Sequence, residues 1–405
     1  MVARAATRPG AGRQDARVGI LAAVSHVDHR TRRATHASAA RGTAMLFVFL
    51  AHFSQELWDG SRASGVPLLL LQIGMVASPT FVLVSGLTLA FVLGRSRPDT
   101  RPLARLRVLD RALFILFVAH AVLVFSDVLL APYERAMRQV FITDLVALNL
   151  MLGLVLLPRT GRAGRLAVAV ILYDLGWVIH FVWHPTRLGL AVAEEILTGP
   201  NSSHALEYGF PVLQWAAVFL VGTVLGDAFV SARTPEARHA WAIRLLRGGA
   251  GAAAAAVCLK AFLMIPEVHA SVAARPELRE FLSLFGKDPP SPIYLMFFGG
   301  IGACIIAVAT LLSVDSWAPR LRAWVSVLGR NSLFAFLLQS AVFRDGIARV
   351  PLEGRPWLWP FAFVAATLFI WSGAWVWDRR GGNRWLTLGI GRLKATAGSI
   401  EARRP

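Results

Sequence analysis

The stretch Pro67–Gly94, PLLLLQIGMVASPTFVLVSGLTLAFVLG, contains no charged side chain and decides the fold class. A helix of about 20 apolar residues is long enough to cross a bilayer. We therefore predict ten spans, near residues 41–58, 67–94, 109–131, 138–157, 165–184, 210–230, 248–266, 291–313, 323–343 and 357–377. Only helices and closed barrels satisfy their backbone hydrogen bonds in lipid, and these runs are too long to be barrel strands. The sequence thus predicts an all-α, polytopic transmembrane helix bundle.

Composition supports a lipid environment. Of the 405 residues, 56% are hydrophobic and only 16% are charged, against about 25% charged residues in a typical soluble domain. The formal net charge is +18, which in a soluble protein would suggest a nucleic-acid partner. Here the basic residues lie in short clusters between the apolar runs, so we interpret them as topology signals and expect the lipid bilayer, and no nucleic acid, as a partner.

The distribution of Lys and Arg predicts the orientation of the spans. If both termini are cytoplasmic, the cytoplasmic segments carry 30 Lys and Arg residues and the outer segments carry 10, with Lys260 and Arg330 inside spans. This is the bias that cytoplasmic loops show. Arg outnumbers Lys by 39 to 3 and Ala is abundant, which is typical of a GC-rich bacterium, so we expect a bacterial inner membrane.

We expect three parts in the chain: a disordered basic cytoplasmic tail (1–34), a transmembrane domain (35–378) and a basic cytoplasmic C-terminal tail (379–405). The two cysteines, Cys258 and Cys304, lie in apolar runs. They indicate neither a disulfide framework nor a metal site.

The first span carries the candidate chemistry in Ser38–Glu56, SAARGTAMLFVFLAHFSQE. Arg41 and His52 are 11 residues apart, which on a helix is about three turns and ~16 Å along the axis, so they share a face. Glu56 lies one turn beyond His52 on the same face. Ionisable groups in a membrane usually face a cavity or a partner. A snorkelling Arg41 and a packed His52 are the structural alternative.

Several motifs carry a family resemblance. Arg41, ten residues, then His52 resembles the R-x10-H signature of the acyltransferase family 3 membrane proteins, whose relatives include OpgC-type glucan-modifying proteins and the heparan-α-glucosaminide N-acetyltransferase group. Four further stretches resemble family motifs: Thr80–Phe91, Phe210–Gly222, Gly286–Pro292 and Leu328–Leu333. The chain departs from the family at Ser38, where an acidic residue is usual, and at Gln339, where a histidine is usual.

The resemblance implies transfer of an acyl group, expected to be acetyl, from cytoplasmic acyl-CoA to a hydroxyl or amine of a sugar or glycan at the membrane or outer side. His52 is then the expected general base, because the unperturbed pKa of histidine, about 6.5, suits proton transfer near neutral pH. Glu56 would orient its imidazole. Guanidinium groups bind phosphates well, so we expect the CoA phosphates to contact Arg41, Arg95, Arg97, Arg105, Arg107 and Arg111.

Other polar residues are expected to line the same site: Ser85, Asn331, His120 and Asp127, the last two on one helix face. No Ser, Cys or Lys stands in a recognisable nucleophile motif, so we expect direct transfer without an acyl-enzyme. We also expect no metal. Two other interpretations stay open. A transporter or flippase would show inverted repeats and discontinuous helices, and the departures at Ser38 and Gln339 are compatible with a catalytically silent assembly subunit.

Overall fold

A computed structural model describes residues 35–57, 66–128, 138–200, 206, 209–315, 317–346 and 356–390. Throughout these ranges the regular elements are helices and no strand occurs, which confirms the predicted all-α class. The predicted N-terminal tail, 1–34, and the end of the C-terminal tail, 391–405, lie outside the described residues. The proposed domain boundaries therefore stay predictions.

The first half of the bundle contains the helices from Thr35 to Ser231. In chain order they are α2 (Thr35–Leu57), α3 (Val66–Gly74), α4 (Ala77–Arg95), α5 (Arg101–Leu113), the π-helical η1 (Phe114–Ala119), α6 (His120–Val128), α8 (Ile142–Leu156), α9 (Arg162–Val182), α10 (Leu188–Thr198) and α11 (Val212–Ser231).

The second half begins with the longest of the described helices. It contains α12 (Pro235–Phe262), α13 (Pro266–Ala273), α14 (Pro276–Phe281), α15 (Pro292–Tyr294), η2 (Leu295–Gly299), α16 (Gly300–Val314), α17 (Pro319–Arg330), α18 (Ser332–Ser340), η3 (Ala341–Gly346), η5 (Pro356–Leu358), α19 (Trp359–Arg379) and η6 (Gly382–Trp385).

Fewer helices than predicted are long and apolar enough to cross a bilayer. Among the described residues seven are, and an eighth span arises if α17 and the following Ser332–Phe343, bent by 73°, count as one. The predicted spans 41–58 and 138–157 correspond to α2, which is polar in its first turns, and to α8, which has only 15 residues. The chain is a multi-pass membrane protein, while the count of ten and the cytoplasmic termini stay predictions.

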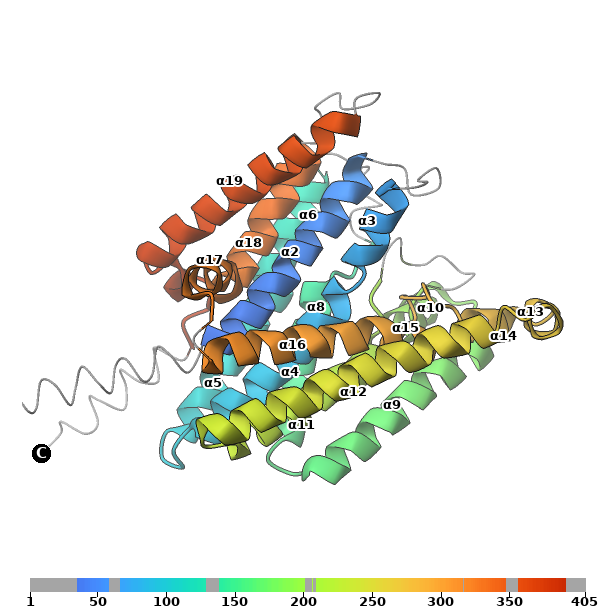
Figure 1. Cartoon of the computed structure of the whole chain (residues 1–405), viewed down its shortest axis with the longest axis horizontal. Coiled ribbons are helices and arrows are strands. Elements are labelled where there is room, and N and C mark those ends of the chain that lie inside the picture. The colour runs from blue at the N-terminus through green and yellow to red at the C-terminus, as the bar shows by residue number, and fades with distance from the viewer. Residues whose placement is uncertain are drawn as a thin grey trace, which may run out of the picture.

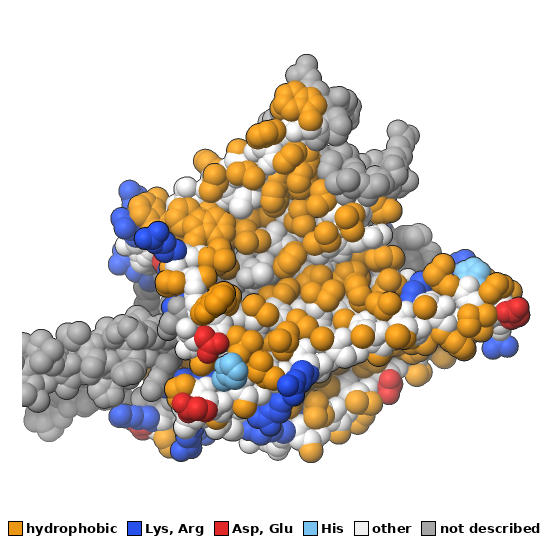
Figure 2. Space-filling view, in the orientation of Figure 1, with side chains coloured by type: hydrophobic (Ala, Val, Ile, Leu, Met, Phe, Trp, Pro, Cys, Tyr) orange, Lys and Arg blue, Asp and Glu red, His pale blue; other side chains and the backbone are white. Residues whose placement is uncertain are grey.

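The helices pack side by side in one bundle (Figure 1), and they differ widely in how much of each is buried. The apolar windows of the spans that contain α4 and α11 are 72% and 61% buried, whereas that of α12 is 17% buried. Figure 2 shows hydrophobic side chains over most of the face formed by α12, α16 and α19, with Lys and Arg concentrated towards one end. The exposed apolar shell is what lipid requires, and the core helices α2, α4 and α11 are left to hold polar groups.

Contacts between helix ends agree with the predicted alternation of direction. Arg105 donates to the carbonyl of Leu154 near the start of α5 and the end of α8, and Arg162 at the start of α9 donates to the carbonyl of Asp227 near the end of α11. Tyr294 Oη donates to the carbonyl of Met75, at the break between α3 and α4 and therefore inside the predicted span 67–94. The first two contacts join helix ends that the predicted alternation places on the same side, and the third does not test it.

Candidate functional site

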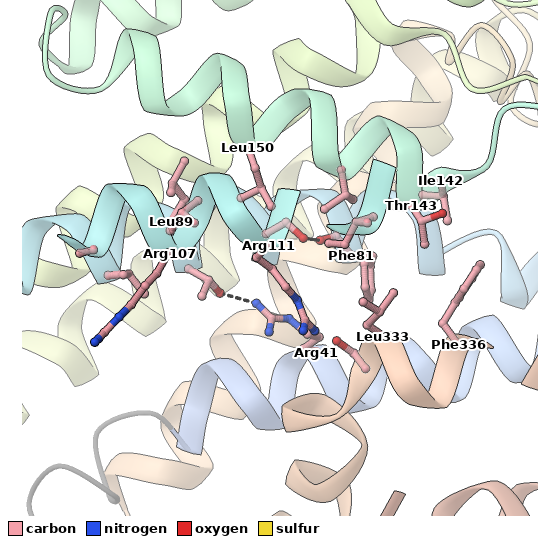
Figure 3. Close-up of a pocket in the computed structure, with 18 of the residues that line it drawn as sticks. Arg41, Phe81, Leu89, Arg107, Arg111, Ile142, Thr143, Leu150, Leu333 and Phe336 are labelled. Atoms are coloured by element: carbon pink, nitrogen blue, oxygen red, sulfur yellow. Dashed lines mark hydrogen bonds between the residues drawn. The ribbon is translucent and has the colours of Figure 1, made fainter. Parts of the chain in front are cut away.

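A cavity of about 510 Å³ lies between α2, α4, the α5–η1 helix, α8 and α18 (Figure 3). One end is cationic, with Arg41, Arg107 and Arg111. The walls between are mainly apolar, and at the other end the lining includes Thr143 and Phe336. The direction from the arginines to Phe336 follows α2 from its N-terminal half towards its C-terminus. The cavity therefore begins at the side where the loops are most basic and runs into the bundle.

The cationic end holds two neighbouring guanidinium groups (Figure 3). Arg41 Nη2 donates to Thr88 Oγ1 at 2.8 Å, and Arg111 Nη1 donates to the carbonyl of Leu386 at 2.6 Å. Within the described part of the chain, no ion pair joins either guanidinium to a carboxylate. Burying like charges without a counter-ion is costly. Charge and geometry thus suit an anion that brings its own negative charge into the cavity.

The crossing of α2 with α17 sets the direction in which Arg41 points. A Cβ atom at Gly42 would collide with the backbone carbonyl of Val325, and a Cβ at Gly329 would collide with that of Ser38. Two glycines that face each other's helix allow the backbones to approach closely. Because Arg41 precedes Gly42, this contact fixes the rotation of α2 about its axis and turns Arg41 away from α17 into the cavity.

The walls between the two ends offer few hydrogen-bonding groups. They are formed largely by Phe81, Leu89, Val108, Ile115, Val146, Leu150 and Leu333. Ser85, which the sequence predicted as polar lining, does line the cavity, but its hydroxyl donates to the carbonyl of Phe81 at 2.8 Å. The cavity therefore combines a cationic end with an apolar sleeve, an arrangement suited to a ligand with an anionic head and a long, less polar arm.

His52 lies one turn beyond Val48, the last residue of α2 that lines the cavity. Its ring stands edge-on to Phe336, with the centroids 6.0 Å apart. Its Nδ1 is 2.9 Å from Nε2 of Gln339, which is fully buried on α18. Since an amide NH2 can only donate, this contact places the proton of a neutral His52 on Nε2. Glu56 belongs to α2, but its side chain lies outside the described residues.

His120 has a partner that the sequence analysis missed. Its Nδ1 is 2.8 Å from Oδ2 of Asp144, and the same oxygen accepts a hydrogen bond from the backbone N–H of Phe141, where it caps the start of α8. The side chain of Asp127, the expected neighbour of His120, lies outside the described residues. The only sequence signal for Asp144 is an acidic residue in the first turn of a helix, which normally indicates a cap.

The remaining predicted residues do not line the cavity. Arg95 and Arg97 are exposed, with Arg95 over the ring of Phe91. Arg105 is held by Leu154. Asn331 is buried, donates to the carbonyl of Val327 and accepts a hydrogen bond from Asn383. Among the described residues no group of three His, Cys, Asp or Glu side chains is placed to hold a metal ion. The structure thus brings together Arg41, Arg107, Arg111 and Ser85, with His52 and His120 next to the cavity.

Comparison with known families agrees with this geometry. Residues 38–375 match the model of a family described as an acyltransferase domain, acyltransferase family 3. The match begins at Ser38, just before Arg41, and ends within α19, so it contains every helix that contributes to the cavity. No curated protein matches the sequence.

Proposed function

Because the chain belongs to acyltransferase family 3, we propose that it transfers an acyl group, in the first place acetyl, from cytoplasmic acyl-CoA to a hydroxyl or amine of a sugar or glycan. The donor is expected to enter from the side of the basic loops, and the acceptor from the opposite side. The observation that carries this proposal is the pair of neighbouring guanidinium groups, Arg41 and Arg111, that no carboxylate within the described residues neutralises.

Acyl-CoA fits the shape and charge of the cavity. Its phosphates would meet Arg41, Arg107 and Arg111, where charge-assisted hydrogen bonds are strongest. Its pantetheine arm would follow the apolar sleeve towards the outer end. Arg41 and His52 lie on one unbroken helix and are ~16 Å apart along its axis, a distance of the same order as that arm. A thioester held in this way ends beside His52.

His52 is the imidazole that we place at the reaction centre. It can serve as the general base that the sequence predicts if Gln339 presents Oε1, because Nδ1 then carries the proton and Nε2 can accept one. With Gln339 Nε2 towards Nδ1, as in the structure, His52 instead donates from Nε2 and can polarise the thioester carbonyl. In either state its removal should abolish most transfer, with Glu56 expected to orient the ring.

The proposal is tested with purified protein in lipid nanodiscs. CoA should raise the midpoint of thermal unfolding, and pantetheine, which lacks the nucleotide phosphates, should raise it much less. His52→Ala should retain the CoA shift and lose about 100-fold or more of acetyl transfer to a glucan acceptor. A matched control is His239→Ala, at a histidine that does not line the cavity. Full transfer by His52→Ala would refute the assigned centre.

The same measurements separate the alternatives. CoA binding without transfer to any acceptor would identify a catalytically silent assembly subunit. This alternative is specific because Gln339 stands where the family usually has a histidine. Absence of any response at saturating CoA would reject the acyl-CoA donor and favour a transporter or flippase.

A further inference from the structure

A second imidazole is held next to the cavity by a carboxylate. The π-helical turn η1 joins α5 to α6, and the backbone N–H of His120 donates to the carbonyl of Ile115, which lines the cavity. A bond from residue i+5 to residue i places the two residues one turn apart on the same face. His120 therefore lies one turn beyond the cavity wall on η1, just as His52 lies one turn beyond it on α2.

His120 points into the protein and is nevertheless accessible. Leu123 and Val124, three and four residues further along the helix, share its face and are 3% and 8% exposed. Phe125, on the outer face of α6, is 65% exposed. The side chain of His120 is 35% exposed although it lies on the buried face. The imidazole thus lies on the inward side of the helix, next to buried residues, and is still partly exposed.

Asp144 gives this imidazole the geometry of a base. Its side chain is only 5% exposed, and its Oδ2 accepts a hydrogen bond from Nδ1–H of His120. A neutral histidine whose Nδ1–H is bound by a carboxylate has its lone pair on Nε2, and the carboxylate stabilises the cation that forms when Nε2 accepts a proton. The hydrogen bond from Phe141 N–H fixes the carboxylate in turn.

We propose that His120 is the base for the acceptor and that Asp144 is its positioning residue, an assignment that rests on the proposed function. His120 Nε2 takes the proton from an acceptor O–H or neutral N–H while the oxygen or nitrogen bonds to the thioester carbonyl carbon. The C–S bond then breaks, CoA leaves as the thiolate with the electron pair, and the imidazolium releases its proton to water. His52, which holds its proton on Nε2, donates to the carbonyl oxygen.

The chain contains a matched control for this pair. His239 and Asp315 approach each other at 3.5 Å, so they repeat the same two groups, but neither lines the cavity. Their side chains are 48% and 45% exposed. Chemistry that depends only on a histidine beside an aspartate should respond equally in both pairs, whereas chemistry at the cavity should respond in one.

The experiment compares His120→Gln and Asp144→Asn with His239→Gln and Asp315→Asn, all full-length in nanodiscs. Asp144→Asn keeps an oxygen to cap α8, removes the charge and replaces the second oxygen by an NH2 group. Transfer of radiolabelled acetyl from acetyl-CoA is measured to two probes, glucosamine for an amine acceptor and methyl glucoside for a hydroxyl acceptor. Carbethoxylation of each histidine by diethyl pyrocarbonate, measured by peptide mass spectrometry, reports nucleophilic imidazole without needing an acceptor.

We expect both cavity variants to lower kcat by about 100-fold or more, with KM for acetyl-CoA and the CoA-induced thermal shift unchanged. Asp144→Asn should slow carbethoxylation of His120 about tenfold, and the control variants should change neither readout. The proposal is overturned if His120→Gln keeps more than a third of the wild-type kcat, or if His120 in Asp144→Asn is modified at the wild-type rate. If the wild-type protein transfers acetyl to neither probe, the rate of carbethoxylation of His120 in the wild-type and Asp144→Asn proteins tests the proposal. Failure of the wild-type protein to bind CoA refutes the donor instead.

Discussion

The two ends of the cavity differ in whether their polar side chains have partners of matching charge or hydrogen-bonding type inside the protein. At the cationic end Arg41 and Arg111 lie together, and their hydrogen bonds go to a neutral hydroxyl and a backbone carbonyl. At the other end the polar groups are matched inside the protein, His52 with Gln339 and His120 with Asp144. Under the proposed function, the end with uncompensated charge binds a ligand of opposite charge, and the end with matched groups holds and moves a proton.

Other arginines in the bundle do have carboxylate partners, so the lack of one among the described residues is a property of the Arg41 and Arg111 site and not of the whole fold. Arg165 on α9 bonds to Asp227 on α11 and is almost fully buried, and Arg330 at the end of α17 bonds to Asp378. The fold can therefore supply carboxylate partners for arginines in its helices. Arg41 and Arg111 stand apart because their partner is expected to arrive with the donor.

The largest effect should appear in the free energy of unfolding, and it should distinguish an arginine that has a carboxylate partner from one that has none among the described residues. Arg165→Met leaves Asp227 without its partner and should lower the free energy of unfolding by about 3 kcal/mol. Arg41→Met removes an unpaired charge and should leave the free protein equally stable or more stable. Thermal unfolding without CoA measures both. Equal losses in the two variants would show that Arg41 is an ordinary structural arginine.

Donor affinity should depend on the cavity arginines and not on their neighbours. Arg41→Gln and Arg111→Gln each remove hydrogen bonds from a charged donor, worth about 1.5–3 kcal/mol, so the Kd for CoA should rise about 10- to 100-fold. Arg105→Gln is the matched control, because Arg105 is held by the carbonyl of Leu154 and does not line the cavity. Calorimetric titration measures all three. An equal loss in Arg105→Gln would place the phosphates at the surface loop instead.

Sequence reasoning predicted the features that regular geometry imposes along one helix. The helix from Thr35 to Leu57 is unbroken, so Arg41 and His52 share a face as their spacing requires. Arg107 and Arg111, four residues apart on α5, both line the cavity. The all-α class followed from runs without charge. These are properties of a single segment, and a period of 3.6 residues is enough to derive them.

The features that the sequence did not predict are contacts between helices, which spacing along the chain does not determine. Thr88 meets Arg41 across 47 positions, and Gln339 meets His52 across 287. Asp144 on α8 meets His120 on α6 across 24 positions, and the π-helical η1 before His120 interrupts the regular α-helical period. Fewer long apolar helices than predicted occur for a related reason, because α2 and α8 are sheltered by neighbours and do not need the apolar length of a lipid-facing helix.

Loss of the contact between Gln339 and His52 should lower kcat less than replacement of His52 or His120. Gln339→Leu keeps the volume and removes the group that fixes the His52 tautomer, so kcat should fall about tenfold with an unchanged Kd for CoA. Gln339→His restores the residue usual in the family and should retain more activity than the leucine variant. Steady-state kinetics of acetyl transfer measures the split between kcat and KM. A change confined to the Kd for CoA would place Gln339 with the donor site instead of the reaction centre.

The smallest effects on CoA affinity should come from two hydroxyl side chains of α4, Thr88 and Ser85. Thr88 accepts a hydrogen bond from Arg41, whereas the hydroxyl of Ser85 donates to the carbonyl of Phe81 on its own helix and has no other partner among the described residues. Thr88→Val should weaken CoA binding about threefold, because Arg41 loses the contact that holds it ready for the phosphate. Ser85→Ala should change the affinity less than twofold, about 0.4 kcal/mol, since its hydroxyl is already satisfied. If Ser85→Ala weakens binding as much as Thr88→Val, the sleeve contributes hydrogen bonds to the donor, and the contrast between a charged end and apolar walls does not describe how the ligand is held.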